Sequence, residues 1–299
     1  MIDLQLHTTD SDGTWPWVRV LDACLAMGLK AFAITDHDTV RRRAEIIEWA
    51  RSHGALAIPG IELSTHDRGQ TVHLLGYFLD GPLKKLESKL AFLLLGRADR
   101  NGLIIRRLQE LGIDITEEEV RKAAGEATMG RPHIARLLLE KKCVKSMQDA
   151  FDRYLGITGS AYFPKEEIPL REGIDLLHEA GAVTSVAHPG LLKRTPEEMQ
   201  ASLEDWRNWG LDGIEAVYPM YSAEQSALFA RSAAKYGFLM TGGSDFHGDN
   251  KPHIKIGVGT GSLHVPDDLI EPLLKKREEI ARAARVHGEP ESLATISAR

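Results

Sequence analysis

Residues 238–249 read FLMTGGSDFHGD and combine an apolar run, two glycines, and a carboxylate and an imidazole two residues apart. The apolar run predicts a short buried strand that ends just before the glycines. Gly242 and Gly243 carry no Cβ, so they allow the backbone to turn sharply after this strand. The turn would direct Asp245 and His247 into a cavity, where both side chains are suited to binding a metal ion.

Similar apolar runs recur along the chain and alternate with amphipathic segments. The runs predict further strands over residues 2–6, 31–35, 56–61, 71–78, 182–187, 213–218 and 254–258. Amphipathic periodicity predicts helices that include residues 18–28, 223–236 and 266–285. This alternation predicts an α/β fold, and the polar groups at the strand ends are typical of the active sites of (β/α) barrels.

Residues 83–165 differ from the rest, because they carry helical periodicity and no strand pattern. We expect a helical subdomain here, inserted into a barrel made of residues 1–82 and 166–285, and a flexible tail over 286–299. Residues 84–165 contain 16 Lys and Arg against 11 Asp and Glu, whereas the remainder contains 21 against 32. The basic segment has two interpretations: ordinary variation among surface helices, or attraction of an anionic substrate.

The composition of the 299-residue chain indicates a globular protein with a net charge of −6. No stretch approaches 18 uninterrupted apolar residues, and no secretory pattern is present, so we expect a cytoplasmic protein without a membrane partner. Cys24 and Cys143 show no CxxC spacing, which argues against a cysteine zinc site. Twelve histidines favour imidazole and carboxylate ligands, which suit manganese, iron, zinc or magnesium.

Side chains able to bind a metal recur inside or just after the predicted strands: His7, Asp12, His37, Glu62, His73, His188, Asp245 and His247. A single buried histidine is more often a hydrogen-bonded core residue than a ligand. The repetition outweighs that interpretation, because burying so many ionisable groups without a counter-charge is costly. The sequence therefore predicts a metal site at the ends of the strands.

The order of these motifs resembles that of a known superfamily. The segments QLHTTDSDGT, ITDHDT, PGIELS, VHLLGY, VAHPG and GGSDFHG resemble the successive motifs of the polymerase and histidinol phosphatase (PHP) superfamily. The resemblance covers almost the whole chain, including the helical insertion with its GRPHIA and SAYFPK segments. It is closest to the stand-alone PHP phosphoesterases that act on nucleotides, and it implies a distorted (β/α)7 TIM-like barrel with a helical insertion and two or three divalent metal ions.

The resemblance also implies which residues hold the metals, with Glu62 as a bridging carboxylate. The implied positions are His7–Glu62–Asp245, Glu62–His73–His188 and Asp12–His37–His247. Gln5 departs from the family pattern, which has histidine there. Its neutral amide oxygen is a weaker ligand than imidazole, so Gln5 could ligate, hold a water, or leave the first position partly filled.

The metals imply hydrolysis of phosphate esters by a metal-activated hydroxide, with charge stabilisation as the main requirement. His37 or His247 could protonate the leaving oxygen, and Asp36 or Asp38 could support the ligands. In the insertion, Arg131 and His133 lie near a predicted helix N-terminus, which favours anions. These two residues and Lys165 are the candidate substrate contacts; an ordinary helix cap with a surface arginine is the alternative.

Three functions remain open from the sequence. The first is a phosphoesterase acting on a mononucleotide, a 3′,5′-bisphosphorylated nucleoside, or a short RNA or DNA end. The second keeps the enzyme class and changes the substrate to histidinol phosphate. The third is a non-catalytic nucleotide- or metal-binding module, with Gln5 weakening one position. The presence of all the other ligands favours an enzyme.

Overall fold

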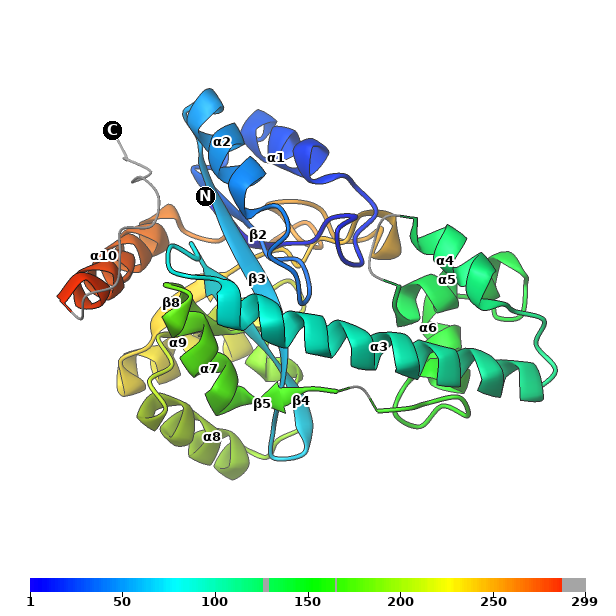
Figure 1. Cartoon of the computed structure of the whole chain (residues 1–299). Helices are drawn as coiled ribbons and strands as arrows, with labels where there is room; N and C mark the ends of the chain where they lie inside the picture. The colour runs from blue at the N-terminus through cyan, green and yellow to red at the C-terminus, as the bar shows by residue number, and fades with distance from the viewer. Residues whose placement is uncertain (126–128, 165, 287–299) are drawn as a thin grey trace.

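The computed structural model describes residues 1–125, 129–164 and 166–286 (Figure 1). Its strands are β1 (Asp3–Leu6), β2 (Ala31–Ile34), β3 (Leu56–Asp67), β4 (Gln70–Tyr77), β5 (Ile168–Pro169), β6 (Val183–Val186), β7 (Gly213–Val217) and β8 (Leu239–Gly242). Its α-helices are α1 (Trp17–Ala26), α2 (Arg43–His53), α3 (Lys84–Glu110), α4 (Glu117–Ala124), α5 (Arg131–Glu140), α6 (Met147–Ala150), α7 (Leu170–Glu179), α8 (Pro196–Asn208), α9 (Ala223–Tyr236) and α10 (Ile270–Val286). Among the residues described, no helix has the length and apolar character needed to span a membrane. The predicted tail lies outside the described residues from 287 onward.

The strands form one mixed sheet in the order β1-β2-β3-β4-β6-β7-β8, with β5 paired to β3. Neighbouring strands are parallel except at β4, which is antiparallel to both β3 and β6. A hairpin joins β3 to β4 through Arg68 and Gly69, whose φ angles are 50° and 72°. The predicted alternation of strand and helix is therefore interrupted here, because a two-residue turn can connect only antiparallel neighbours.

The sheet is curled, and its first strand meets the segment that follows its last. Leu6 pairs in parallel with Phe246. The amide of His7 donates to the carbonyl of Phe246 at 3.0 Å, and the amide of Asp245 donates to the carbonyl of Gln5 at 3.0 Å. These bonds place the end of β1 beside the GSDFH segment, so residues far apart in the chain meet at one edge of the sheet.

The strand predicted over residues 254–258 is wrong. This segment forms turns, with an isolated bridge between Lys255 and Gly259 and φ angles of 73° and 54° at Gly257 and Gly259. Ile254 and Ile256 are buried in the core beside helix α1 and strand β2. The apolar pattern therefore reflects core packing of a looped segment rather than a strand.

The segment expected to form the helical insertion contains helices α3, α4, α5 and α6, which share a hydrophobic core. Figure 1 shows α3 running away from the sheet, with α4, α5 and α6 gathered near its far end. The first half of α3 packs Leu86, Leu90 and Leu93 on the core beneath the sheet, while its second half packs Ile104 and Leu108 into the core of the insertion. Helix α3 therefore connects two hydrophobic cores.

Candidate active site

The predicted ligand residues meet at one edge of the sheet. His7 follows β1 and His37 follows β2, whereas Glu62 lies within β3. His73 lies on β4 opposite Ser64, two residues from Glu62 along β3. Residues two apart on a strand share a face, so the hairpin brings His73 and Glu62 together.

Glu62 is the point of convergence and is almost fully buried. One of its oxygens, Oε2, lies 2.9 Å from His7 Nε2, and the other, Oε1, lies 2.7 Å from His73 Nδ1 and 3.3 Å from His188 Nε2. Burial opposes the charged carboxylate, but His37 and His73, together with the other imidazoles, outweigh burial and hold the pKa of Glu62 well below its usual range. Glu62 is therefore a carboxylate at neutral pH, as a bridging ligand must be.

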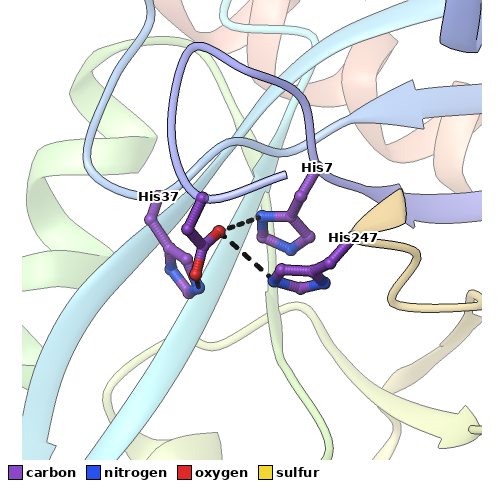
Figure 2. Close-up of side chains that lie close together, drawn as sticks. His7, His37 and His247 are labelled. Atoms are coloured by element: carbon purple, nitrogen blue, oxygen red, sulfur yellow. Dashed lines mark ion pairs between the residues drawn. The ribbon is translucent and has the colours of Figure 1, made fainter. Parts of the chain in front are cut away.

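Asp12 organises a second group of imidazoles. Figure 2 shows the rings of His7, His37 and His247 converging, with dashed lines marking ion pairs. Asp12 Oδ1 lies 3.3 Å from His247 Nε2 and 3.7 Å from His7 Nδ1, and Asp12 Oδ2 lies 3.9 Å from His37 Nε2. The rings of His7 and His247 are stacked, with centroids 4.0 Å apart. Three imidazoles and one carboxylate are ligand types that a divalent cation can bind.

Asp245 lies beside the histidines that surround Glu62 and Asp12. Its Oδ1 is 3.5 Å from His7 Nε2 and 3.4 Å from His247 Nδ1. Its φ of 54° is in the left-handed region, where a non-glycine residue is strained and often functional. The preceding glycines have a different role from the one expected, since neither has a positive φ. A Cβ at Gly243 would lie 2.5 Å from the amide nitrogen of Gln5. Glycine is thus needed for close approach to β1, and Asp245 itself makes the turn.

The donor set fits divalent metal ions. Three groups have ligand atoms within 4.8 Å of one another, namely His7–Asp12–His37–His247, His37–Glu62–His73 and His7–Glu62–Asp245. Both ring nitrogens of His7 and Nδ1 of His73 are buried without a hydrogen-bond partner among the described residues. Imidazole nitrogens that face carboxylates without hydrogen-bond geometry are suited to metal binding.

Asp36, predicted as a support for the ligands, lies against the loop that carries His7 and Asp12. Its carboxylate accepts hydrogen bonds from the amide of Thr8 at 2.7 Å, from Thr8 Oγ1 at 2.6 Å and from Ser11 Oγ. Burial raises the pKa of Asp36, although His7 and these donors lower it. Asp36 therefore fixes the loop between His7 and Asp12 rather than acting on a substrate.

A pocket of about 220 Å³ opens beside the metal-binding groups and is walled on its other side by the insertion. Its sheet side carries Asp12, His37 and His73, and its insertion side includes Arg97, Arg100, Arg131 and Phe151. A larger depression of about 700 Å³ lies along α10, but its lining has no histidine. The smaller pocket is the one that combines ligand atoms with guanidinium groups.

Two of the three predicted substrate contacts lie at this pocket or behind it. Arg131 begins α5 and donates from Nη1 to the carbonyl of Leu155 at 3.0 Å. His133 is buried, and its Nδ1 accepts from the amide of Gly130 at 3.1 Å, so it supports the helix start. Lys165 lies outside the described residues.

No family profile matches the chain, but individual proteins match most of it. A 5′-3′ exoribonuclease of Haemophilus influenzae is 30% identical over 245 residues, which cover 82% of this chain and 89% of that protein. The chain belongs to the PHP family of phosphoesterases. A 3′,5′-nucleoside bisphosphate phosphatase of Chromobacterium violaceum is 28% identical over 82% of this chain and 87% of that protein. A solved structure presented as a metal-dependent phosphoesterase from Bifidobacterium adolescentis superposes with a TM-score of 0.80 and 29% identity, covering 92% of this chain and 96% of that one.

The three groups differ in two ways from the sets implied by the PHP resemblance. First, His37 joins Glu62 and His73, whereas His188 lies at the edge of that group, 3.3 Å from Glu62. Second, His7 joins the group of Asp12, His37 and His247. The amide nitrogen of Gln5 donates to Glu62 Oε2 at 3.0 Å, and the Gln5 amide oxygen is buried without a hydrogen-bond partner among the described residues. Gln5 therefore lies against the His7–Glu62–Asp245 group in this PHP chain.

Sequence reasoning missed four polar residues at the site: Arg97, Arg100, Tyr218 as a partner of Asp245, and Lys251. The signal for Arg100 was present, because Leu93, Arg100 and Ile104 lie on one face of α3. A guanidinium on an otherwise apolar helix face needs a partner or a ligand. Tyr218 and Lys251, which contact Asp245, do not lie on an apolar helix face and could not be found in this way.

Proposed function

We propose that this PHP chain hydrolyses phosphate esters of nucleotides with divalent metal ions held around Glu62. The observation that carries the proposal is the pocket where the ligand groups face Arg97, Arg100 and Arg131. Phosphoryl transfer requires both the metal ligands and the arginines. Charge develops on the transferred phosphoryl group, and the rest of the anionic substrate must be held in position. The names of the relatives, an exoribonuclease and a nucleoside bisphosphate phosphatase, support a nucleotide as substrate.

The three ligand groups are our candidate metal positions, and Glu62 is shared by two of them. Manganese, zinc, iron and magnesium all suit such ligands, and two or three ions fit the number of groups. When bound, these ions lower the pKa of water to supply a hydroxide nucleophile and offset the charge of the phosphoryl oxygens. Glu62 keeps the positions adjacent because its two oxygens face different imidazoles.

His37 and His247 are better suited to holding a metal than to donating a proton. Burial lowers the pKa of His37 to about 3, in spite of Glu62 and Asp12, so its imidazole is neutral at pH 7. His247 Nδ1 lies 2.8 Å from the carbonyl oxygen of Asp245, which can only accept a hydrogen bond. Nδ1 therefore carries the proton, and the lone pair of Nε2 faces Asp12.

Arg100 and Arg131 are the residues proposed to bind phosphate. Arg100 is 5% exposed, and its Nε has no hydrogen-bond partner among the described residues. Neither arginine forms an ion pair with a carboxylate in the part of the chain described. Burial lowers the pKa of Arg100 to about 10, and Arg131 and Arg97 add to the effect, so the group remains charged at pH 7. Adjacent buried guanidinium groups favour binding of an anion between them.

We further propose that β1–β4 and β6–β8 are the strands of a distorted (β/α)7 barrel, and that residues 83–165 form its substrate cap. The hydrogen bonds between β1 and the segment after β8 support closure of the sheet. The separate core of the insertion supports its treatment as a unit. The arginines that line the pocket come from this unit, which supports its role in substrate binding.

The test is a phosphate-release assay on metal-stripped protein reloaded with Mn²⁺, Mg²⁺ or Zn²⁺. The panel contains a 3′,5′-bisphosphorylated nucleoside, mononucleotides, a 5′-phosphorylated oligoribonucleotide and histidinol phosphate. We expect metal-dependent release from nucleotides, and highest kcat/KM where a second phosphate can reach the arginines. Release from histidinol phosphate alone, or from no member of the panel, would reject the proposal.

A further inference from the structure

Lys251 contacts Asp245 on the side away from the ligand groups. Its ammonium Nζ lies 2.6 Å from Asp245 Oδ2, and the hydroxyl of Tyr218 donates to the same oxygen at 2.9 Å. The other oxygen, Oδ1, faces His7 and His247. The two oxygens of Asp245 therefore have separate partners, with one held by the chain and one directed to the proposed metal position.

The lysine is held in place by its own loop. The amide of Asp249 donates to Thr14 Oγ1 at 2.7 Å, and the side chain of Asn250 donates to the carbonyl of Asp12 at 2.6 Å. Arg136, on helix α5 of the insertion, donates to Asn250 Oδ1. These bonds hold the loop just before Lys251, and its partly exposed side chain reaches the site through the ion pair with Asp245.

Lys251 faces a carboxylate of the His7–Glu62–Asp245 group. Its Nζ lies 2.6 Å from Asp245 Oδ2, and a lysine side chain is ordinarily an ammonium at neutral pH. At the same position, Glu62 accepts a hydrogen bond from the Gln5 amide. The negative charge on both carboxylates of the His7–Glu62–Asp245 group is thus partly offset by donors of the chain itself.

We infer that Lys251 is a positioning residue whose fixed positive charge weakens metal binding at the His7–Glu62–Asp245 position and leaves that position readily exchangeable. An ammonium and a divalent ion on the two oxygens of one carboxylate repel each other. A carboxylate shared with an ammonium is also a weaker donor to a metal. Occupancy of this position then follows the free metal concentration, while the groups around Asp12 and His73 keep their ions. The inference rests on the proposed function in one respect, namely that Asp245 binds a metal.

The test measures metal affinity directly. Parent and Lys251→Met proteins are stripped, titrated with Mn²⁺ against a fluorescent chelator, and assayed for metal content after dialysis. Lys251→Met should bind its weakest Mn²⁺ about tenfold more tightly, because one repulsive charge is removed. Lys251→Arg should match the parent because it keeps the charge. Lys255→Met, which removes an exposed lysine from the same loop, is the matched control and should leave affinity unchanged.

Tyr218→Phe separates charge from hydrogen bonding, since it removes a donor to the same oxygen without changing the charge. We expect a change of less than about threefold. Unchanged or weaker Mn²⁺ binding in Lys251→Met would overturn the inference and leave Lys251 as a structural contact. If this variant fails to fold, Lys251→Gln provides the same comparison.

A further variant distinguishes failure of this inference from failure of the proposed function. Asp245→Asn should lose the weakest Mn²⁺. If it keeps every metal of the parent, the metal assignment of Asp245 is wrong. If it loses the metal while Lys251→Met is unchanged, only the role of Lys251 is wrong.

Discussion

Glu62 lies beside the imidazoles of His7, His73 and His188 and is shared by two of the three candidate metal groups. Glu62→Gln should lower bound metal and reduce phosphate release by more than about a hundredfold, because a neutral amide cannot serve two cations. The measurement is elemental analysis together with kcat/KM. Glu48→Gln, an exposed change on α2, is the control. Full metal content with near-parent turnover would contradict the bridging assignment.

Gln5 stands where the PHP resemblance leads us to expect histidine, and its amide is within hydrogen-bond distance of Glu62. Gln5→His should tighten Mn²⁺ or Zn²⁺ at the first position, since a nitrogen ligand replaces a neutral amide. A chelator titration of both proteins measures the effect, with about a tenfold gain expected. Equal chelator resistance would mean that Gln5 already ligates well, or that this side chain lies outside the coordination sphere.

At the scale of residues, the sequence predicted which side chains would meet but not what each would do. Residue type and position near an apolar run predicted that the ligand-type residues meet at the strand ends, and the PHP resemblance implied that His7, Glu62 and Asp245 form one group, as they do here. The hydrogen-bond partners of Asp36 were not predictable, because they come from a loop whose shape the sequence does not encode locally. Lys251 was missed for the same reason, since its neighbour Asp245 is reached only through the turn.

Helices α3 and α5 bring their arginines to the pocket from two separate parts of the insertion. Arg131→Ala should raise KM for a bisphosphorylated nucleoside about tenfold or more and change kcat little, because a remote anion contact stabilises the bound and transition states about equally. The effect should shrink for a substrate with one phosphate. Steady-state kinetics on both substrates measure it.

The control for this prediction is Arg106→Ala, which removes an exposed arginine from α3 and should change neither constant. Equal KM values for Arg131→Ala and the parent on every nucleotide would show that the insertion does not bind the substrate.

Individual elements were predicted well where the pattern was long or the turn chemistry distinct. A threonine followed three residues later by a glutamate predicts a capping box, and Thr116 forms one with Glu119 at the start of α4, as Thr195 does with Glu198 at the start of α8. The apolar run at 254–258 failed, because burial alone does not distinguish a strand from a turn packed into the core. The antiparallel placement of β4 was also not predicted, since periodicity carries no information about strand direction.

The whole metal-free molecule should respond to pH through the buried imidazoles. Burial lowers the pKa of His7, but Glu62, with Asp12 and Asp245, outweighs burial and raises the pKa to about 9. Metal must displace this proton, so Mn²⁺ affinity should rise between pH 7 and pH 9 by about tenfold per unit and level off above that range. Chelator titrations at fixed pH, corrected for protonation of the chelator, measure this. An affinity independent of pH would contradict it.

The raised pKa of His7 also determines whether the metal-free protein becomes more or less stable as the pH rises. His7 is more basic in the folded chain than in the unfolded chain, whose imidazole titrates near its usual value. Its stabilising contribution is therefore complete at low pH and is lost as pH rises towards about 9. Thermal melts of stripped protein from pH 7 to pH 9 should show a falling Tm, and a Tm that rises over this range would contradict the assignment.

At the scale of the molecule, the alternation of strand and helix patterns predicted an α/β fold, and the described structure has one. The position of the insertion relative to the ligands was not predictable, because it depends on how α3 spans the two cores. That position creates the pocket in which arginines lie opposite the ligand residues. The arginines are what favour a phosphorylated nucleotide as the substrate.

The most direct test measures metal content and phosphate release in a single preparation before stripping, after stripping and after reloading with Mn²⁺. With a 3′,5′-bisphosphorylated nucleoside as substrate, we predict that release falls to background when metal is removed. It should return as two or three ions bind per chain. Undiminished release from protein without detectable metal would contradict the account.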